Sequence, residues 1–176
     1  MILDSLASIM IGILYEEDVL NIKNVLKNFT TPKRRFKETK VGSNILIDDY
    51  AHHPTEIEKT IEAARLKYPD KRIVAIFKPN TYSRTNDLKE WFKEALRKAD
   101  DIYVTPISCN RERQEDYPGV TSEIIIENLD NAYILDENNI EALLKYENSV
   151  LIFMSCANIS TLEEKYKQEK LLNFDK

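Results

Sequence analysis

Glycine is scarce in this sequence: its 176 residues include only Gly12, Gly42 and Gly119. A Walker phosphate loop and a Rossmann dinucleotide fingerprint each need at least two glycines at fixed spacing, which these three do not provide. Both glycine-rich nucleotide-binding loops are therefore excluded. If the chain takes part in ATP chemistry, we expect another domain to supply the phosphate loop.

Cysteine and clustered basic residues are scarce as well. Cys109 and Cys156 have neither the number nor the spacing of a disulfide framework or a zinc site, so we expect reduced thiols in a cytoplasmic protein. The 25 Lys and Arg residues face 30 Asp and Glu residues, for a net charge of −5. Because phosphate neutralisation needs basic residues concentrated on one face, we expect no nucleic-acid partner.

The sequence also lacks a run of about 18–20 apolar residues, the length that spans a bilayer, so we expect no membrane partner. The apolar stretch 1–15 has neither the basic flank nor the cleavage site of a secretory signal. Its apolar residues recur at helical spacing, and Val19, Ile22, Leu26 and Phe29 predict a second helix.

From residue 35 onwards, strand patterns and helix patterns alternate along the chain. Strands are expected at 35–41, 44–50, 72–78, 101–105, 132–135 and 149–154. Helices are expected at 54–68, 85–99, 121–129, 138–146 and 159–172, and 107–119 is expected to be a surface loop. This alternation predicts an α/β fold with a Rossmann-like, doubly wound, mostly parallel sheet, helices on both faces, and two short helices in front.

Both histidines of the chain follow a predicted strand, in the segment DDYAHHPTE from Asp48 to Glu56. Proline suits the first position of a helix, so Pro54 places His52 and His53 at the junction of strand and helix. Backbone N–H groups and the helix dipole favour an anion at such a junction. The alternative is that His53 only caps the helix.

A comparable turn, KPNTYSRT, follows the next predicted strand from Lys78 to Thr85. Thr85 is expected to cap the following helix. Arg84 can hold a ligand carboxylate by a bidentate contact, and a surface ion pair with Asp87 is the alternative. Since ligands bind beyond the carboxyl ends of strands in open α/β sheets, the two turns predict one cleft. Cys156, which follows the last predicted strand, is expected to pack in the core.

Two of these segments closely resemble the C-terminal domain of the Mur ligases: DDYAHHPTE at 48–56 and FKPNTYSRT at 77–85. The resemblance runs over nearly the whole chain, with weaker likenesses in KRRF, PGVTS and ANI. It implies that residues 31–176 are the C-terminal α/β domain. Residues 1–30 would then be the helical tail of the preceding, ATP-binding domain.

The resemblance implies ATP-dependent synthesis of an amide bond in peptidoglycan precursor formation. ATP would phosphorylate the carboxylate of UDP-N-acetylmuramate, and the amine of L-alanine would attack the acyl phosphate. ATP and Mg²⁺ would be bound mainly by the missing central domain of the complete enzyme, where positive charge stabilises phosphoryl transfer. Without its N-terminal and central domains, the chain is expected to be inactive.

The resemblance also assigns roles to single residues. Arg35 would contact the ATP phosphates and Asp49 the ribose hydroxyls. His52 would be the catalytic group, and no metal ligand is expected. The residues that line the amino-acid site would be Tyr50, His52, Thr81 and Arg84.

The chain departs from the family pattern near the second turn, where Lys78 and Asn80 replace the usual glutamine and histidine. Three alternatives therefore stay open. The first is a recycling ligase that adds a whole peptide to the same sugar nucleotide. The second is a free-standing, non-catalytic nucleotide- or ligand-binding module. The third is a metal-dependent hydrolase built on the two histidines.

Overall fold

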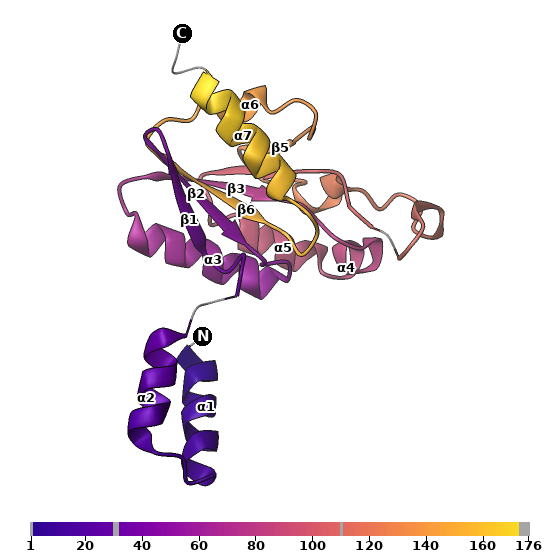
Figure 1. Ribbon diagram of the computed structural model, residues 1–176. Helices are drawn as coiled ribbons and strands as arrows, with labels where there is room; N and C mark the ends of the chain where they lie inside the picture. Colours follow the sequence, from indigo (N-terminus) through magenta and orange to yellow (C-terminus); the bar gives the residue numbers. More distant parts are fainter. Residues whose placement is uncertain (1, 30–31, 110, 173–176) are drawn as a thin grey trace. The chain divides into compact units, whose positions relative to one another are not determined.

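A helical hairpin forms the unit at the start of the chain, Met1–Lys33 (Figure 1). Its helices are α1 (Ile2–Leu14) and α2 (Val19–Asn28), which confirms the two predicted short helices. Asp18 caps α2, since its carboxylate accepts a hydrogen bond from the Asn21 N–H at 3.3 Å.

The second unit, Arg34–Lys176, begins three residues after the predicted boundary, which falls on residues 30 and 31. The computed structural model describes residues 2–29, 32–109 and 111–172, so that boundary lies outside the described residues. The assignment of 1–30 to a preceding domain stays a prediction. Within the described ranges, no helix combines the length and the apolar character that crossing a membrane requires.

Six strands of the second unit form one sheet, in the order β1-β2-β6-β3-β4-β5. β1 is antiparallel to β2, and all other neighbours are parallel, which confirms the mostly parallel sheet. The strands are β1 (Lys37–Val41), β2 (Asn44–Asp49), β3 (Arg72–Phe77), β4 (Asp101–Val104), β5 (Ala132–Ile134) and β6 (Ser149–Met154).

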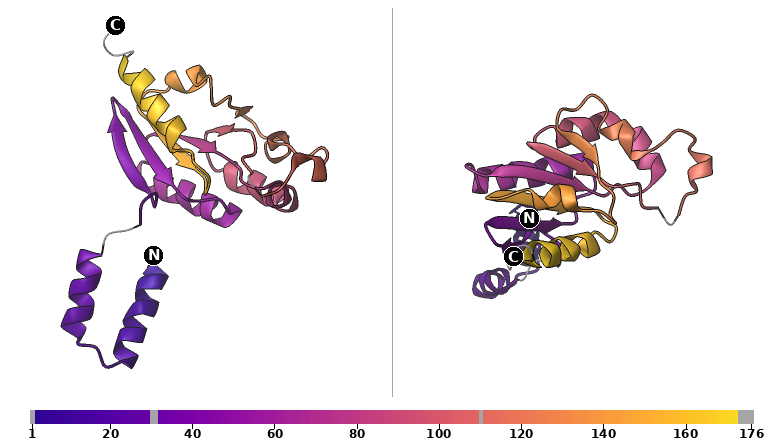
Figure 2. Two further views of the ribbon diagram at one scale, coloured as in Figure 1. Left: turned by 45° about the vertical axis from the view of Figure 1, so that its right-hand side comes forward. Right: turned by 90° about the horizontal axis from the view of Figure 1, so that it is seen from above.

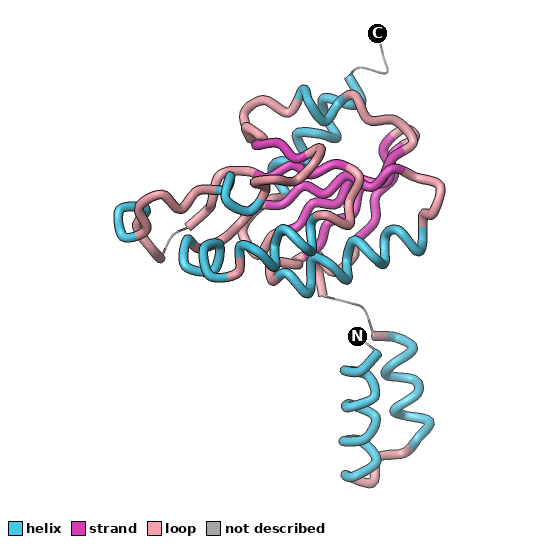
Figure 3. The backbone as a smooth tube through the Cα atoms, turned by 180° about the vertical axis from the view of Figure 1, so that it is seen from behind, coloured by secondary structure: helices cyan, strands magenta, loops and turns pink. Residues whose placement is uncertain are grey.

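Helices cover both faces of this sheet, as predicted (Figures 1 and 3). α3 and α5 lie on one face, and α6 and α7 lie on the other. The helices are α3 (Pro54–Lys67), α4 (Tyr82–Asp87), α5 (Lys89–Leu96), α6 (Glu141–Leu144) and α7 (Ser160–Leu172), with 3-10 turns η1 (Gln114–Asp116) and η2 (Ser122–Ile125).

The central strands are buried on both faces because each face carries its own apolar cluster. Along β3, Ala75 and Phe77 join the cluster beneath α3 and α5, whereas Val74 and Ile76 join the cluster beneath α6 and α7. All four are fully buried. Such continuous apolar strands are typical of parallel sheets covered on both sides.

The helix predicted at 85–99 starts earlier than expected and is interrupted. The chain enters α4 at Tyr82 and breaks at Leu88 before α5. The prediction that Thr85 caps the helix is wrong, because Thr85 lies inside α4. Its hydroxyl donates to the carbonyl of Thr81, one turn earlier, at 2.7 Å.

Two further predicted helices are much shorter than expected. Residues 121–129 contain only η2, whose Ser122 hydroxyl donates to the Thr105 carbonyl at 2.7 Å. In 138–146, helix α6 is delayed by two side-chain turns, in which Asp136 and Asn139 accept backbone N–H groups two residues ahead. These side chains compete with helical hydrogen bonds.

Residues 107–109 and 111–119 of the predicted loop project beyond the sheet, between β4 and η2 (Figure 2). This loop is attached to α4 by a stacked pair of rings, Tyr82 and Tyr117, with centroids 6.0 Å apart. Glu112 of the same loop accepts a hydrogen bond from the Ser83 N–H at 3.1 Å. The loop therefore holds a defined position against the turn that follows β3.

Candidate functional site

The turn after β2 starts α3 with a capping box. The Thr55 N–H donates to His53 Nδ1 at 3.3 Å, and Glu56 Oε2 accepts the His53 N–H at 3.1 Å. Pro54 occupies the first helical position, as predicted. His53 is therefore a helix cap. Burial alone would raise the pKa of Glu56, but the N–H groups of His52 and His53 outweigh it and lower that pKa.

Asp49 ends β2 as a buried carboxylate that is bonded to backbone on both oxygens. Oδ2 accepts the Phe36 N–H at 2.7 Å, and Oδ1 accepts the Ala51 N–H at 2.8 Å. Burial raises the pKa of Asp49, and these two hydrogen bonds only partly offset that effect. The carboxylate thus ties the segment before β1 to the end of β2.

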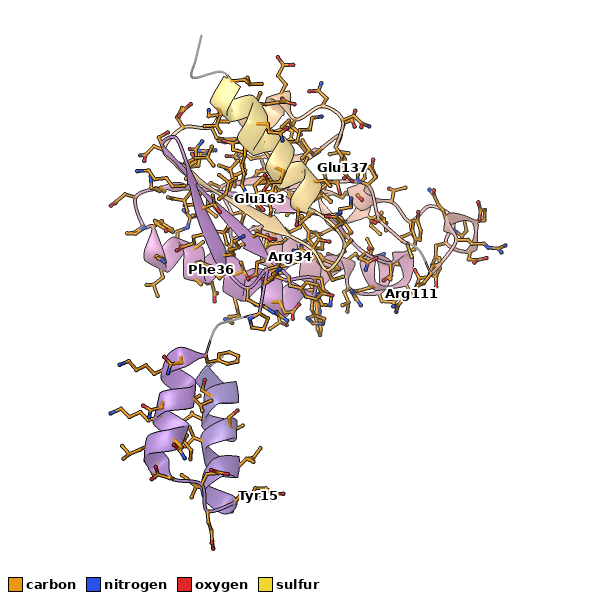
Figure 4. All side chains as sticks on the ribbon, viewed as in Figure 1. Tyr15, Arg34, Phe36, Arg111, Glu137 and Glu163 are labelled. Carbon is orange, nitrogen blue, oxygen red and sulfur yellow. The ribbon has the colours of Figure 1, made fainter. Side chains whose placement is uncertain are left out.

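Arg34 is a site residue that the sequence analysis missed, and Figure 4 shows it where the second unit begins. Its Nε donates to Asp48 Oδ1 at 3.0 Å. Nη1 and Nη2 donate to the carbonyls of Ala157 and Ser155, at 3.0 and 2.8 Å. The sequence signal that could have indicated Arg34 was Asp48, because a carboxylate at the end of a buried strand needs a cationic or hydrogen-bonding partner.

Two cationic side chains lie close to the ring of Tyr50. The Arg35 guanidinium lies 5.3 Å from the ring centroid and that of Arg34 lies 5.6 Å from it. The His52 ring meets it edge-on at 5.5 Å, and His52 Nδ1 lies 3.0 Å from the Tyr50 carbonyl oxygen. Glu56 Oε2 lies 3.3 Å from the same nitrogen, so both neighbours of Nδ1 are hydrogen-bond acceptors.

In the turn after β3, Thr81 and Arg84 are the unusual residues. Thr81 has a φ of 77°, which is rare for a β-branched residue, and its side chain makes no capping bond to α4. Arg84 Nη1 is buried and makes no hydrogen bond to the residues that the structure describes. Lys78, by contrast, is neutralised by Glu137 at 2.8 Å.

A cleft of about 520 Å³ opens where these turns meet, beyond the carboxyl ends of β2, β3 and β6. No carboxylate is among its described lining residues. The lining residues are Tyr50, His52, Lys78, Asn80, Thr81, Arg84, Ser108, Cys109, Arg111, Cys156, Ala157 and Asn158.

The structure brings together the four residues predicted for the amino-acid site, since Tyr50, His52, Thr81 and Arg84 all line this cleft. Arg35 and Asp49 are not among its lining residues. Asp49 ends β2, and Arg35 precedes β1, with its guanidinium beside the Tyr50 ring. The prediction that Cys156 packs in the core is wrong, because Cys156 is only partly buried and lines the cleft.

The described residues contain no group of three or more His, Cys, Asp or Glu side chains close enough together to hold a metal ion. The two neighbouring histidines make different contacts, with His53 Nδ1 committed to the helix cap.

Comparison with known proteins identifies the family to which the chain belongs. Residues 34–155 match the family model described as "Mur ligase, glutamate ligase domain". The chain belongs to the Mur ligase family. A UDP-N-acetylmuramate–L-alanine ligase from Limosilactobacillus reuteri (strain DSM 20016) is 40% identical over 167 residues, which are 95% of this chain and 38% of that Mur ligase.

Solved Mur ligase structures share the fold. UDP-N-acetylmuramate–alanine ligase from Thermotoga maritima matches 99% of this chain and 37% of its own, with a TM-score of 0.70 and 23% identity. A domain from a putative UDP-N-acetylmuramate:L-alanyl-γ-D-glutamyl-meso-diaminopimelate ligase of Haemophilus ducreyi 35000HP matches 77% of this chain and 99% of its own, with a TM-score of 0.57 and 22% identity. The chain spans about two fifths of the length of the two ligases named first.

Proposed function

We propose that this chain is the C-terminal domain of a cytoplasmic UDP-N-acetylmuramate–L-alanine ligase in peptidoglycan precursor synthesis. The relative that is 40% identical over 95% of the chain supports the reaction. In that reaction an acyl phosphate made from ATP and UDP-N-acetylmuramate is attacked by the amine of L-alanine, which releases phosphate. The N-terminal and central domains would bind most of the ATP and Mg²⁺, so the chain alone should be inactive.

The observation that carries the domain's own role is the unpartnered Nη1 of Arg84. A buried donor of a charged group costs free energy until an acceptor reaches it. Three cations line the cleft: Lys78 already pairs with Glu137, and Arg111 is exposed. Arg84, with its buried unpartnered nitrogen, is therefore the cation that we consider suited to an incoming carboxylate. We assign it to the carboxylate of L-alanine, with Thr81 beside it.

His52 and Tyr50 form the opposite side of the proposed amino-acid site. The amine of alanine is a nucleophile only after its ammonium form loses a proton. His52 lines the cleft and its Nδ1 lies beside two acceptor oxygens, so we assign Nε2 as the nitrogen that takes this proton. The proposed catalytic role of His52 is to take that proton. Tyr50 holds the His52 ring edge-on and so orients it.

The nucleotide would bind along the end of β2. Arg35 is an exposed cation held beside Tyr50, in a position to meet phosphate oxygens. Each Asp49 oxygen accepts one backbone N–H and keeps a lone pair, so the carboxylate can still accept ribose hydroxyls.

A chimera tests the proposal: the N-terminal and central domains of the Limosilactobacillus reuteri ligase, followed by this chain. We expect ATP-dependent formation of UDP-N-acetylmuramoyl-L-alanine by the chimera, detected by mass spectrometry, and none by the chain alone. Arg84→Met should raise the KM for L-alanine about 10–100-fold and leave the KM for ATP within about twofold. Arg97→Met is the matched control, since Arg97 is the exposed C-cap residue of α5 and pairs with Glu94.

The same chimera separates the alternatives. Ligation of the tripeptide L-alanyl-γ-D-glutamyl-meso-diaminopimelate in place of L-alanine would favour the recycling ligase, a possibility consistent with the size of the cleft. A folded chimera that ligates neither acceptor would favour the non-catalytic module. An Arg84→Met variant with an unchanged KM for alanine would remove Arg84 from the amino-acid site.

A further inference from the structure

We propose that Glu112 is a positioning residue for Arg84. Its carboxylate, on the projecting loop, caps the first turn of α4 and so fixes the backbone that carries the Arg84 guanidinium. The inference rests on the proposed function, because it takes the role of Arg84 in the amino-acid site as given. Glu112 is not among the described residues that line the cleft, so it acts through α4 and not by touching the substrate.

The helix α4 has no side-chain cap from the residue that precedes it. Its N-cap residue, Thr81, has a φ of 77° and makes no side-chain capping hydrogen bond. The first N–H groups of a helix have no partner inside the helix, and a helix of six residues is too short to be stable by its own hydrogen bonds. The position of α4 therefore depends on an acceptor from elsewhere in the chain.

Glu112 supplies that acceptor, although it lies 29 residues beyond Ser83. Its Oε2 accepts the Ser83 N–H at 3.1 Å, and its Oε1 accepts the Ser83 hydroxyl. The bond from this hydroxyl is the largest cause that lowers the pKa of Glu112 below its ordinary value of 4.5; the N–H groups of Ser83 and Tyr82 add to it, and burial opposes it. At neutral pH the cap is therefore a carboxylate, whose charge also suits the amino end of a helix.

The loop that carries Glu112 is itself attached to the β3 turn on both sides of this residue. Before it, the Ser108 N–H donates to the Pro79 carbonyl at 2.9 Å. After it, the Tyr117 ring stacks on the Tyr82 ring. A carboxylate held at both ends in this way can define where α4 begins.

Arg84 directly follows Ser83, so the cap acts on its immediate neighbour. Nη1 of Arg84 is buried and has no hydrogen-bond partner among the described residues, so that nitrogen does not anchor the guanidinium. The charge of Arg84 is a further cause of the lowered pKa of Glu112, yet both oxygens of Glu112 are bonded to Ser83. Glu112 thus orients Arg84 through the backbone and leaves Nη1 to an incoming carboxylate.

Kinetics of the chimera described above test this role with Glu112→Ala. We expect the KM for L-alanine to rise about tenfold, with kcat and the KM for ATP within about twofold, because only the group that binds the alanine carboxylate is misplaced. Glu112→Gln keeps an acceptor for the Ser83 N–H and should recover most of the loss. Glu115→Ala is the matched control, since Glu115 is an exposed glutamate of the same loop.

A double-variant cycle distinguishes positioning from an independent contribution to the site. In an Arg84→Met background, Glu112→Ala should raise the KM for L-alanine by less than about twofold further, because the group that Glu112 positions is already absent. A further increase as large as that of Glu112→Ala alone would overturn the proposal. Circular dichroism first establishes that each variant is folded.

A second measurement uses the complete chain and no substrate. Amide hydrogen exchange followed by NMR should be about tenfold faster at Ser83 in Glu112→Ala than in wild type, and unchanged in Glu115→Ala. Equal exchange at Ser83 in all three proteins contradicts the cap.

The outcomes separate this inference from the proposed function. An inactive chimera, or an Arg84→Met variant with an unchanged KM for L-alanine, overturns the proposed role of Arg84 and this inference with it. An active chimera in which Arg84→Met raises that KM but Glu112→Ala does not overturns this inference alone.

Discussion

The two turns that build the cleft differ in how they use their polar groups. In the β2 turn, residues 48–56, the charged side chains are bonded to the protein itself. In the β3 turn, residues 78–85, Arg84 has an unpartnered buried nitrogen and Thr81 has a strained backbone. The charged groups of the β2 turn thus mainly hold that turn together, whereas the β3 turn keeps an unpartnered cationic group for a ligand.

The largest expected effect tests the structural character of the β2 turn through Arg34→Met. The substitution leaves Asp48, which is 5% exposed, without its ion-pair partner. Breaking a buried pair from one side should lower the free energy of unfolding by about 3 kcal/mol. Urea unfolding followed by circular dichroism measures it, with Arg97→Met as the exposed control.

A second substitution separates the contribution of the Arg34–Asp48 ion pair from that of the other hydrogen bonds of Arg34. Adding Asp48→Asn to Arg34→Met should recover part of the lost stability, because it removes the unpaired charge. A double variant no more stable than Arg34→Met would show that the two carbonyl bonds of Arg34, and not the ion pair, hold the turn.

A smaller effect is expected from Glu56→Gln, which weakens the capping box of α3 by about 1 kcal/mol at neutral pH. The folded-state pKa of Glu56 lies below its ordinary value of 4.5, so its stabilisation is present above pH 4.5 and is lost as the pH falls through the lower folded-state value. Wild type and variant should therefore converge in acid. Glu115→Gln, at an exposed residue of η1, should show no such convergence in thermal unfolding.

The smallest effect has the opposite sign and tests the strain in the β3 turn. Thr81→Gly removes the cost of a positive φ for a β-branched residue and adds back the chain entropy of glycine, for a net gain of about 0.5–1 kcal/mol. Thr121→Gly is the control: Thr121 has an extended backbone, so glycine there should only destabilise. Equal losses at both positions would show that the β3 turn is not strained.

Much of the fold was predictable because its signals are local. Buried strands such as β3 are short apolar runs, and Pro54 marks the start of α3 in the sequence itself. The errors occurred where side chains compete with the backbone. Asp136 and Asn139 postpone α6, and the hydroxyl of Thr85 bonds back to the carbonyl of Thr81.

The cleft was only half predictable, because its other half depends on strand order. β6 pairs between β2 and β3, although it is the last strand of the chain, and this places the segment that holds Cys156 between the two turns. No local sequence pattern predicts that β6 pairs between β2 and β3. Likewise, nothing in the run Lys33-Arg34-Arg35 shows that the middle residue turns inward to Asp48 while the last one stays exposed.

Arg34 also gives the second unit a mechanical property. The residue at which the chain enters this unit is fastened to the end of β2 through Asp48 and to the segment after β6 through two carbonyls. A displacement of Arg34 would be transmitted directly to Ala157, which lines the cleft. The end of β2 and the segment after β6 should therefore keep their mutual spacing for as long as Arg34 holds them.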